Sequence, residues 1–403
     1  MNRNFGRHIA WFVIGGMICF ISACNNDSVS EMQAESFLKY YTAGTDNNTG
    51  TEVIQTSDGY VILGNFENAS TQKDIFIIFT DEFGRQKTGD PIVIGTDIDD
   101  HGYSMIRLTD GGYLISGTSF NATEKQGYLV NISSDGTVLW EQNYNGYTEL
   151  EFRSAYPASD GHIIITGYSK RNPGDDTEAI IAKTSATGDL MWLRSYNYPG
   201  RNDVGEAIIE DQSRYHVLTT STAISNTRLS RIRILNTNTN GGAPTSYEIQ
   251  KDYYSGKDIT LNTAGNMYIL GNVQNPVSAK SNIFLAELEL TWNGSITNLK
   301  DSATISYQES LHAESFAPVE QSSLAIGGWQ IKPNDIDILL LQVEVGNDFK
   351  FEMLNTYGTK GSQTSQNIIY TGDDRGFALT GSVDLAGGTI SMLLKVGPDG
   401  ELK

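Results

Sequence analysis

Three acidic side chains recur at one position of a repeating unit, and a ring of carboxylates of this kind could bind a cation. Counting six residues back from a recurring turn gives a polar residue in every unit: Glu52, Ser104, Ser154, Glu206, Asp258, Ser315 and Asn367. Carboxylate and amide oxygens are the ligands of Ca²⁺, and carboxylates that share a site raise one another's pKa. We therefore predict Glu52, Glu206, Asp258 and Asn367 as a ring that binds a cation or another ligand. The alternative is that these side chains hydrogen-bond backbone groups and water in a channel.

Aromatic side chains near the ends of three strands could form a binding surface. Phe66, Tyr168 and Trp329 occupy comparable places after a strand glycine. Aromatic rings supply large apolar area and are common in ligand sites, so we predict these three residues as an aromatic rim. Trp140 and Trp192 lie on strands that we expect to pack sheet against sheet, and we place them in the core.

Known catalytic and metal-binding motifs are absent from the sequence. It contains no Gly-x-Ser-x-Gly elbow, no His-Glu-x-x-His helix and no phosphate-binding glycine loop. The histidines beyond the N-terminal segment fall at different places in the repeat, so they imply no shared metal site: His101, His162, His216 and His312. The only cysteines, Cys19 and Cys24, lie near the N-terminus, which excludes disulfides and a cysteine nucleophile elsewhere. We expect no cofactor, with calcium at the polar ring as the one open possibility.

A repeat with a spacing of 50 to 57 residues must position these side chains. Its most regular position, at which we expect a strand to end, is occupied by Gly64, Gly117, Gly167, Thr219, Gly271, Gly328 and Gly381. In each unit a turn such as Asp110-Gly111-Gly112 separates short runs of β-branched and aromatic residues, which is typical of a hairpin. A third apolar run and a fourth strand follow. The sequence thus predicts four-stranded antiparallel blades, and a fixed period of this size is typical of a β-propeller.

The last unit stops before its fourth strand, and the beginning of the repeat region offers a replacement. The segment Phe37–Tyr41 resembles the fourth strands that end at Tyr144 and Tyr196. We therefore predict an all-β fold over residues 36–403: a seven-bladed β-propeller closed by the N-terminal strand, which completes the last blade. Such closure removes an unpaired sheet edge.

Residues 1–23 have the composition of a lipoprotein signal peptide. Arg3 and Arg7 precede an apolar run of eleven residues, which is too short to span a bilayer. The sequence Ile21-Ser22-Ala23-Cys24 matches the bacterial lipobox, so we predict lipidation of Cys24; an ordinary secretory signal is the alternative. Residues 24–35 are polar and are predicted to form a tether. Because Asn25 gives no inner-membrane retention signal, we expect a lipid anchor in the outer membrane, on a side that the sequence leaves open.

One stretch of the chain resembles a known repeat. Residues 102–117, followed by residues 127–132, Asp135-Gly136 and Trp140, are similar to the repeat of bacterial secreted and lipoprotein β-propellers. Gly188 and Trp192 also resemble the tryptophan-docking motif of quinoprotein-like propellers. The resemblance to the secreted and lipoprotein β-propeller repeat covers nearly all of the chain from Phe37 onward and implies the fold, whereas the tryptophan-docking motif occurs in two units only. Because propellers host unrelated functions, the resemblance implies no particular activity.

Charge and the missing motifs guide the functional prediction. The formal net charge of −20 argues against nucleic acid as a partner. Since no catalytic motif is present, we predict a monomeric, non-enzymatic binding or scaffold lipoprotein that holds an envelope protein or a glycan. The alternative is a polysaccharide-active hydrolase or lyase with carboxylates at the channel mouth. Glycoside hydrolysis would require two carboxylates about 5–9 Å apart.

Overall fold

The computed structural model describes residues 36–402, apart from 45–46, 69–71, 88, 97, 122, 292–293, 321, 347, 360, 373 and 386. The regular structure of these residues consists of β-strands. The predicted signal peptide (residues 1–23), the lipidation site Cys24 and the tether up to residue 35 lie outside the described residues. No helix among the described residues is long and apolar enough to cross a membrane.

The strands form six sheets in which consecutive strands pair antiparallel. The first four-stranded sheet contains β2 (Asn48–Thr56), β3 (Gly59–Glu67), β4 (Lys73–Thr80) and β5 (Ile92–Ile94). An eight-stranded sheet follows, with β6 (Asp100–Arg107), β7 (Tyr113–Phe120), β8 (Lys125–Ile132), β9 (Val138–Tyr144), β10 (Glu149–Pro157), β11 (Ile163–Lys170), β12 (Glu178–Thr184) and β13 (Leu190–Tyr196). Its two halves are joined by one parallel residue pair, Glu149 with Lys125.

The remaining four sheets have four strands each. Two of them contain β14 (Arg201–Asp211), β15 (Arg214–Ala223), β16 (Ser230–Asn238) and β17 (Thr245–Glu248), and then β18 (Tyr254–Leu261), β19 (Met267–Gln274), β20 (Ser281–Leu290) and β21 (Ile296–Ile305). The next contains β22 (Ser310–Pro318), β23 (Ser323–Lys332), β24 (Asp335–Glu344) and β25 (Lys350–Tyr357). The last contains β26 (Gln363–Thr371), β27 (Gly376–Leu385), β28 (Gly388–Val396) and β1 (Phe37–Tyr41).

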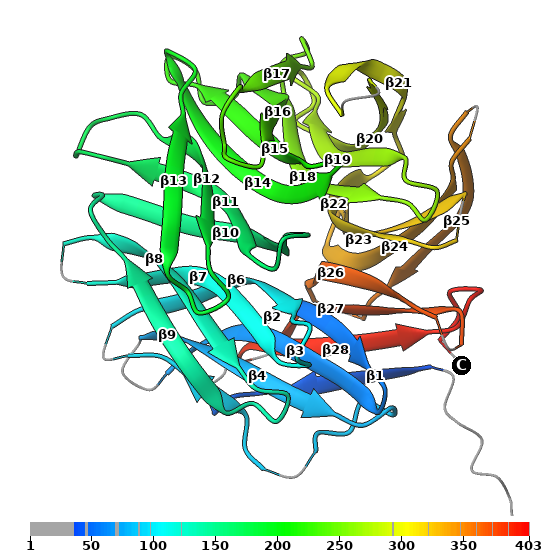
Figure 1. Ribbon diagram of the computed structural model, residues 1–403. Helices are drawn as coiled ribbons and strands as arrows, with labels where there is room; N and C mark the ends of the chain where they lie inside the picture. The colour runs from blue at the N-terminus through cyan, green and yellow to red at the C-terminus, as the bar shows by residue number, and fades with distance from the viewer. Residues whose placement is uncertain are drawn as a thin grey trace, which may run out of the picture. The chain divides into compact units, whose positions relative to one another are not determined.

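The N-terminal strand lies where the sequence placed it. β1 pairs antiparallel with β28 over its whole length, from Phe37 opposite Lys395 to Tyr41 opposite Ser391, and the two strands lie side by side in Figure 1. In the same view β2, β6, β10, β14, β18, β22 and β26 surround the middle of the sheets. These first strands contact one another in turn, and β26 contacts β2. The all-β architecture of four-stranded antiparallel groups is therefore confirmed, although the sheets number six.

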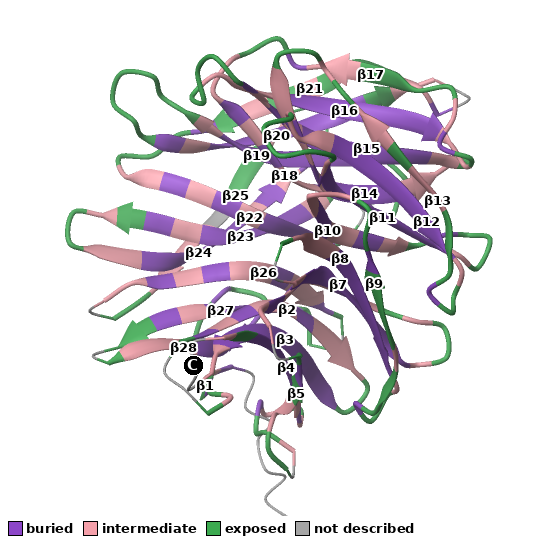
Figure 2. Cartoon of the chain, turned by 90° about the vertical axis from the view of Figure 1, so that its left-hand side faces the viewer, coloured by how far each residue is buried: buried purple, intermediate pink, exposed green. Residues whose placement is uncertain are grey.

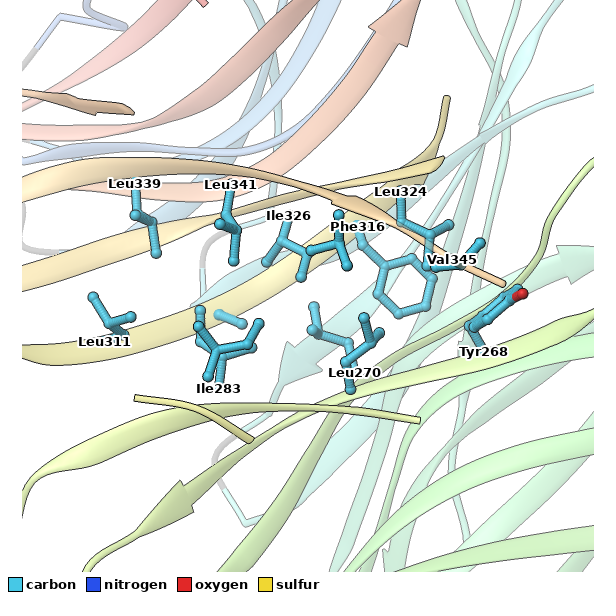
Figure 3. Close-up of a cluster of buried hydrophobic side chains, with 14 residues drawn as sticks. Tyr268, Leu270, Ile283, Leu311, Phe316, Leu324, Ile326, Leu339, Leu341 and Val345 are labelled. Atoms are coloured by element: carbon cyan, nitrogen blue, oxygen red, sulfur yellow. The ribbon is translucent and has the colours of Figure 1, made fainter. Parts of the chain in front are cut away.

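The core lies between neighbouring groups of strands. Second and third strands are buried along most of their length because both of their faces are covered, whereas outer strands such as β9 are largely exposed (Figure 2). One cluster fills the space between the sheets β18–β21 and β22–β25, with Leu270, Ile326 and Leu341 at its centre (Figure 3). Another joins the last sheet to the first, with Tyr41 beside Tyr60 and Phe76. Each fully buried aliphatic side chain contributes about 1.5–3 kcal/mol.

Aromatic residues of four fourth strands attach one group of strands to the next one. Four tyrosine hydroxyls donate a hydrogen bond to a glycine carbonyl in a turn of the neighbouring group: Tyr41 to Gly84 (2.6 Å), Tyr144 to Gly188 (2.5 Å), Tyr196 to Gly241 (2.7 Å) and Tyr357 to Gly400 (2.5 Å). Trp140 and Trp192 pack over two of the same glycines, as we predicted for core residues: a Cβ on Gly188 would lie 2.8 Å from the Trp140 ring. Tyr41 of β1 thus makes the same contact as the tyrosines of other fourth strands.

Candidate active site at the mouth of the first strands

Every first strand carries a β-bulge that changes where one side chain points. The register of each first strand against its second strand shifts by one residue near its N-terminal end. The residues inside these shifts, called the bulge residues below, are Thr51, Tyr103, Arg153, Glu206, Lys257, Glu314 and Gln366. A bulge leaves one residue out of the ladder and re-aims its side chain. Because the bulge recurs in every repeat, seven side chains are re-aimed near one end of the first strands.

The recurring glycine of the sequence makes this bulge possible. A Cβ on Gly117 would lie 2.0 Å from the carbonyl oxygen of His101, and one on Gly328 would lie 1.9 Å from that of His312. In these repeats the second strand therefore approaches the bulged first strand too closely for a side chain at this position, although Thr219 occupies the equivalent position of β15. We predicted that strands end at these glycines, which is wrong: β7, for example, continues to Phe120.

Most members of the predicted polar ring follow the bulge and bind backbone groups. Four such contacts join one first strand to the next: Met105 N to Glu52 Oε2 (2.7 Å), Phe316 N to Asp258 Oδ2 (3.2 Å), Ile368 N to Ser315 Oγ (2.9 Å) and Val53 N to Asn367 Oδ1 (3.2 Å). This is the structural role that we gave as the alternative. Burial raises the pKa of Glu52 to about 7 and that of Asp258 to about 7.

Glu206 does not belong to this ring. It is the bulge residue of β14, and Ala207 takes the position that Glu52 and Asp258 occupy in their strands. Its carboxylate binds Arg153 of the neighbouring strand β10, with 2.6 Å between Oε2 and Nη1. The alignment was wrong by one residue here, and three carboxylates are not brought together. Across the described residues, no group of three or more His, Cys, Asp or Glu side chains is placed to hold a metal ion.

The three residues of the predicted aromatic rim lie in different sheets. Tyr168 and Trp329 occupy equivalent positions, one residue after the strand glycine, and both are near bulge residues. The Tyr168 hydroxyl donates to Glu149 (3.1 Å) and accepts from Lys125 Nζ (3.1 Å). Phe66 is buried and packs edge-on against Phe76, with ring centroids 6.2 Å apart.

A cavity of about 590 Å³ opens where four bulge residues meet. This cavity, called the mouth pocket below, is lined by Thr51, Tyr103, Glu314 and Gln366 together with His101 and Lys73. His101 and Tyr103 are two residues apart on β6, and their ring centroids are 4.5 Å apart. An imidazole and a phenol side by side in a cavity of this size can act as a pair of proton-transfer groups.

The surroundings of the pair fix its protonation. Burial is the main cause that lowers the pKa of His101 to about 4; the charge of Glu151 opposes this shift, and the nearby cations Lys73, Lys125 and Arg153 add to it. The imidazole is therefore neutral at pH 7 and can accept a proton. Burial raises the pKa of Tyr103, so the phenol keeps its proton.

A buried carboxylate organises the positive charge beside this pair. Glu151, which is 1% exposed, accepts hydrogen bonds from Tyr103 Oη (3.1 Å), Lys125 Nζ (2.7 Å) and Arg153 Nε (2.5 Å). Burial alone would raise the pKa of Glu151, but the charges of Arg153 and Lys125 outweigh burial and hold it below its ordinary value. The ionised carboxylate thereby fixes the Tyr103 hydroxyl and both cations in place.

Sequence reasoning passed over these residues. His101 was considered only as one of four histidines that imply no shared metal site, and neither Tyr103 nor Glu151 was singled out. A signal was nevertheless present, since the residue before the polar ring position is polar in six of the seven repeats: Thr51, Tyr103, Arg153, Lys257, Glu314 and Gln366. Aligning that position would have found most of the bulge residues.

Comparisons with known proteins give a fold and no family. No family model and no curated protein matches the sequence. Among solved structures, the chain is similar to an ulvan lyase of a polysaccharide lyase family named PL25, with a TM-score of 0.61 and 13% identity over 90% of this chain and 96% of that chain. A PL25 ulvan lyase bound to -[GlcA(1-4)Rha3S]- gives a TM-score of 0.60 with the same identity and coverage. The polysaccharide lyase Uly1 gives 0.50 with 10% identity, over 93% of this chain and 94% of that chain.

These similarities overturn our main functional prediction. We expected a non-enzymatic scaffold because no catalytic motif was found, whereas the three structures described above are all polysaccharide lyases. The finding favours the alternative that we kept, a polysaccharide-active enzyme. The residues that line the mouth pocket come from several strands, so no short sequence motif contains them.

Proposed function

We propose that this protein is a polysaccharide lyase that cleaves its substrate by β-elimination beside a uronate residue, with the mouth pocket as the active site. One observation carries the proposal: the rings of a neutral His101 and a protonated Tyr103 lie side by side, with centroids 4.5 Å apart, in a pocket that Lys73 also lines. The similarity in fold to lyases, one of them bound to a glucuronate-containing saccharide, supports the same reaction class.

β-Elimination makes three demands, and residues of the mouth pocket can meet each one. The C5 proton next to the uronate carboxylate must be removed, which requires a base such as the neutral His101. The C4–O bond then breaks as the C4–C5 double bond forms, and the departing oxygen needs a proton, which the Tyr103 hydroxyl can donate. Lys73, an exposed cation that lines the pocket, can neutralise the carboxylate whose negative charge grows in the transition state. The proton gained by His101 balances the one lost by Tyr103.

Activity and its products test this proposal. The purified protein should depolymerise a glucuronate-containing polysaccharide and release unsaturated uronate, which is detected by its ultraviolet absorbance. His101→Ala and Tyr103→Phe should each reduce kcat by about 10²–10⁴-fold, the usual contribution of a positioned acid or base. His162→Ala is the matched control, because His162 lies next to the turn before β11 and outside the mouth pocket. New reducing ends without a double bond would instead identify a hydrolase, and an inactive wild-type protein on uronate polysaccharides would refute the proposal.

We also infer that the six sheets represent seven blades of one propeller closed by β1. The eight-stranded sheet depends on a single parallel pair, Glu149 with Lys125. Similar isolated parallel pairs link other neighbouring groups, Asn47 with Thr389 and Ile336 with Ser362, without merging their sheets. The bulge also occurs once in β6 and once in β10, as expected for two blades. Limited proteolysis should release no stable fragment if the blades form one closed ring.

We infer in addition that Cys24 carries a lipid anchor that holds the enzyme at the outer membrane. The support is the lipobox Ile21-Ser22-Ala23-Cys24 and the absence of an inner-membrane retention signal. Growth with labelled palmitate should label the wild-type protein and leave Cys24→Ser unlabelled. Labelling of both proteins, or of neither, would refute lipidation at Cys24. Protease treatment of intact cells then determines which side of the membrane the enzyme faces.

A further inference from the structure

A second cavity lies beside the mouth pocket and shares a wall with it. Its volume is about 500 Å³, and its lining includes Lys257, His312, Glu314 and Trp329. Glu314 also lines the mouth pocket, so the two cavities are neighbours. We call the second cavity the tryptophan pocket. A ligand chain that leaves the mouth pocket past Glu314 would enter it.

The tryptophan pocket contains a rigid aromatic surface. Trp329 of β23 lies directly opposite His312 of β22, and their rings are nearly parallel, with centroids 5.4 Å apart and an interplanar angle of 13°. Burial and the charge of Lys257 lower the pKa of His312, so this stack is uncharged at pH 7. Trp329 is partly exposed although most of β23 is buried. A partly exposed indole that stacks on His312 is suited to packing against the C–H face of a sugar ring.

Polar groups surround this aromatic surface, as a sugar requires. Lys257 Nζ lies 2.9 Å from both carboxylate oxygens of Glu314, so the pair can offer donors and acceptors with little net charge. Arg228, Ser255 and Gln274 supply further hydrogen-bonding groups around the lining. A cavity with one apolar face and a polar rim matches a sugar residue better than it matches an apolar ligand or a bare ion.

We propose that the tryptophan pocket is a second saccharide subsite, which binds another sugar residue of the chain whose uronate occupies the mouth pocket. This proposal rests on the proposed lyase function. It implies that the enzyme acts on chains long enough to reach both pockets and discriminates against shorter ones. The stack of Trp329 on His312 would then determine the preferred chain length.

Kinetics on saccharides of increasing length test this subsite. With the wild type, kcat/KM should rise sharply once the substrate is long enough to fill both pockets. Trp329→Ala should lower kcat/KM on these longer substrates by about tenfold, the loss expected when roughly 1.4 kcal/mol of stacking is removed. The substitution should change KM more than kcat. Trp329→Phe, which keeps an aromatic surface, should recover part of this loss. Phe351→Ala, at an exposed aromatic of β25 in the same sheet, should match the wild type.

The outcomes separate this inference from the lyase assignment. An active wild-type enzyme whose chain-length dependence is unchanged in Trp329→Ala would overturn the subsite and leave the lyase assignment standing. An inactive wild type would overturn the lyase assignment itself. Binding can then be measured independently by titrating His101→Ala with uronate oligosaccharides and following tryptophan fluorescence. Saturable quenching in His101→Ala that disappears in His101→Ala/Trp329→Phe supports the subsite, and unchanged quenching in the double variant contradicts it.

Discussion

Replacing Glu52 by glutamine should change how the stability of the protein depends on pH. Glu52 lies in the ring of side chains that joins the first strands, and its Oε2 accepts a hydrogen bond from Met105 N (2.7 Å). Burial raises its pKa from 4.5 to about 7, and the charge of Asp258 adds to the effect. Glutamine has nearly the same shape and keeps an oxygen that can accept the same hydrogen bond. The substitution therefore removes the ionisation while it keeps the contact.

The size and sign of the effect follow from the difference in pKa. Below pH 4.5 the carboxyl group is protonated in both the folded and the unfolded state, and its contribution to stability is complete. Between pH 4.5 and 7 the unfolded state loses the proton first, so the free energy of unfolding falls as the pH rises. Each pH unit corresponds to about 1.4 kcal/mol, which gives a total loss of about 3 kcal/mol above pH 7. Glu52→Gln escapes this loss and should be more stable than the wild type at pH 8 by about that amount.

Denaturant unfolding at a series of pH values measures the difference between the two proteins. The stability gain of Glu52→Gln should be near zero at pH 4, increase between pH 4.5 and 7, and stay constant above pH 7. Glu352→Gln, which removes an exposed carboxylate from β25, serves as the control and should show no such step. A gain that is independent of pH would mean that water reaches Glu52 and that burial does not control its ionisation, which would refute the reasoning.

Three further predictions concern closure, the bulge and catalysis. Tyr41→Phe should lower the free energy of unfolding by about 1–3 kcal/mol, because the Gly84 carbonyl loses its hydrogen-bond donor. Thermal unfolding measures this loss. Tyr40→Phe, at an exposed ring, is the control and should have little effect. Gly117→Ala should destabilise the protein by about 1–3 kcal/mol and displace β6, since the added Cβ would lie 2.0 Å from the His101 carbonyl oxygen. Gly346→Ala is the control and should be tolerated, because open space surrounds Gly346. If His101 is the base, kcat/KM of the lyase should rise with pH through about 4 and then level off, as a pH–rate profile would show. An equal effect of both tyrosine or both glycine substitutions, or a rate that rises only near neutral pH, would contradict these expectations.

Much of the fold could be predicted because its signals are local or repeated. Turns, alternating apolar runs and the tyrosine that ends four of the fourth strands occur within a few residues of one another, and each repeat supports the others. This is why the pairing of Phe37–Tyr41 with the last sheet was predicted correctly: Tyr41 binds Gly84 as Tyr144 binds Gly188.

The candidate site could not be predicted in the same way, because a single inserted residue decides it. The bulge shifts the register by one, and a shift of one residue exchanges the two faces of a strand. Nothing in the spacing of the sequence reveals where Glu206 stands relative to that shift, so it was placed in the ring instead of beside Arg153.

The sequence alone determined that the chain folds into repeated four-stranded antiparallel units, since the hydrophobic alternation and turn residues that specify a blade lie within the blade itself. Only the tertiary structure decided which side chains share a cavity and in what charge state. The imidazole of His101 is neutral because it is buried and lies near cations from β4, β8 and β10. The Tyr103 hydroxyl is held by a hydrogen bond to Glu151, about fifty residues away along the chain. Burial and charge depend on distances through space, which the order of residues does not contain.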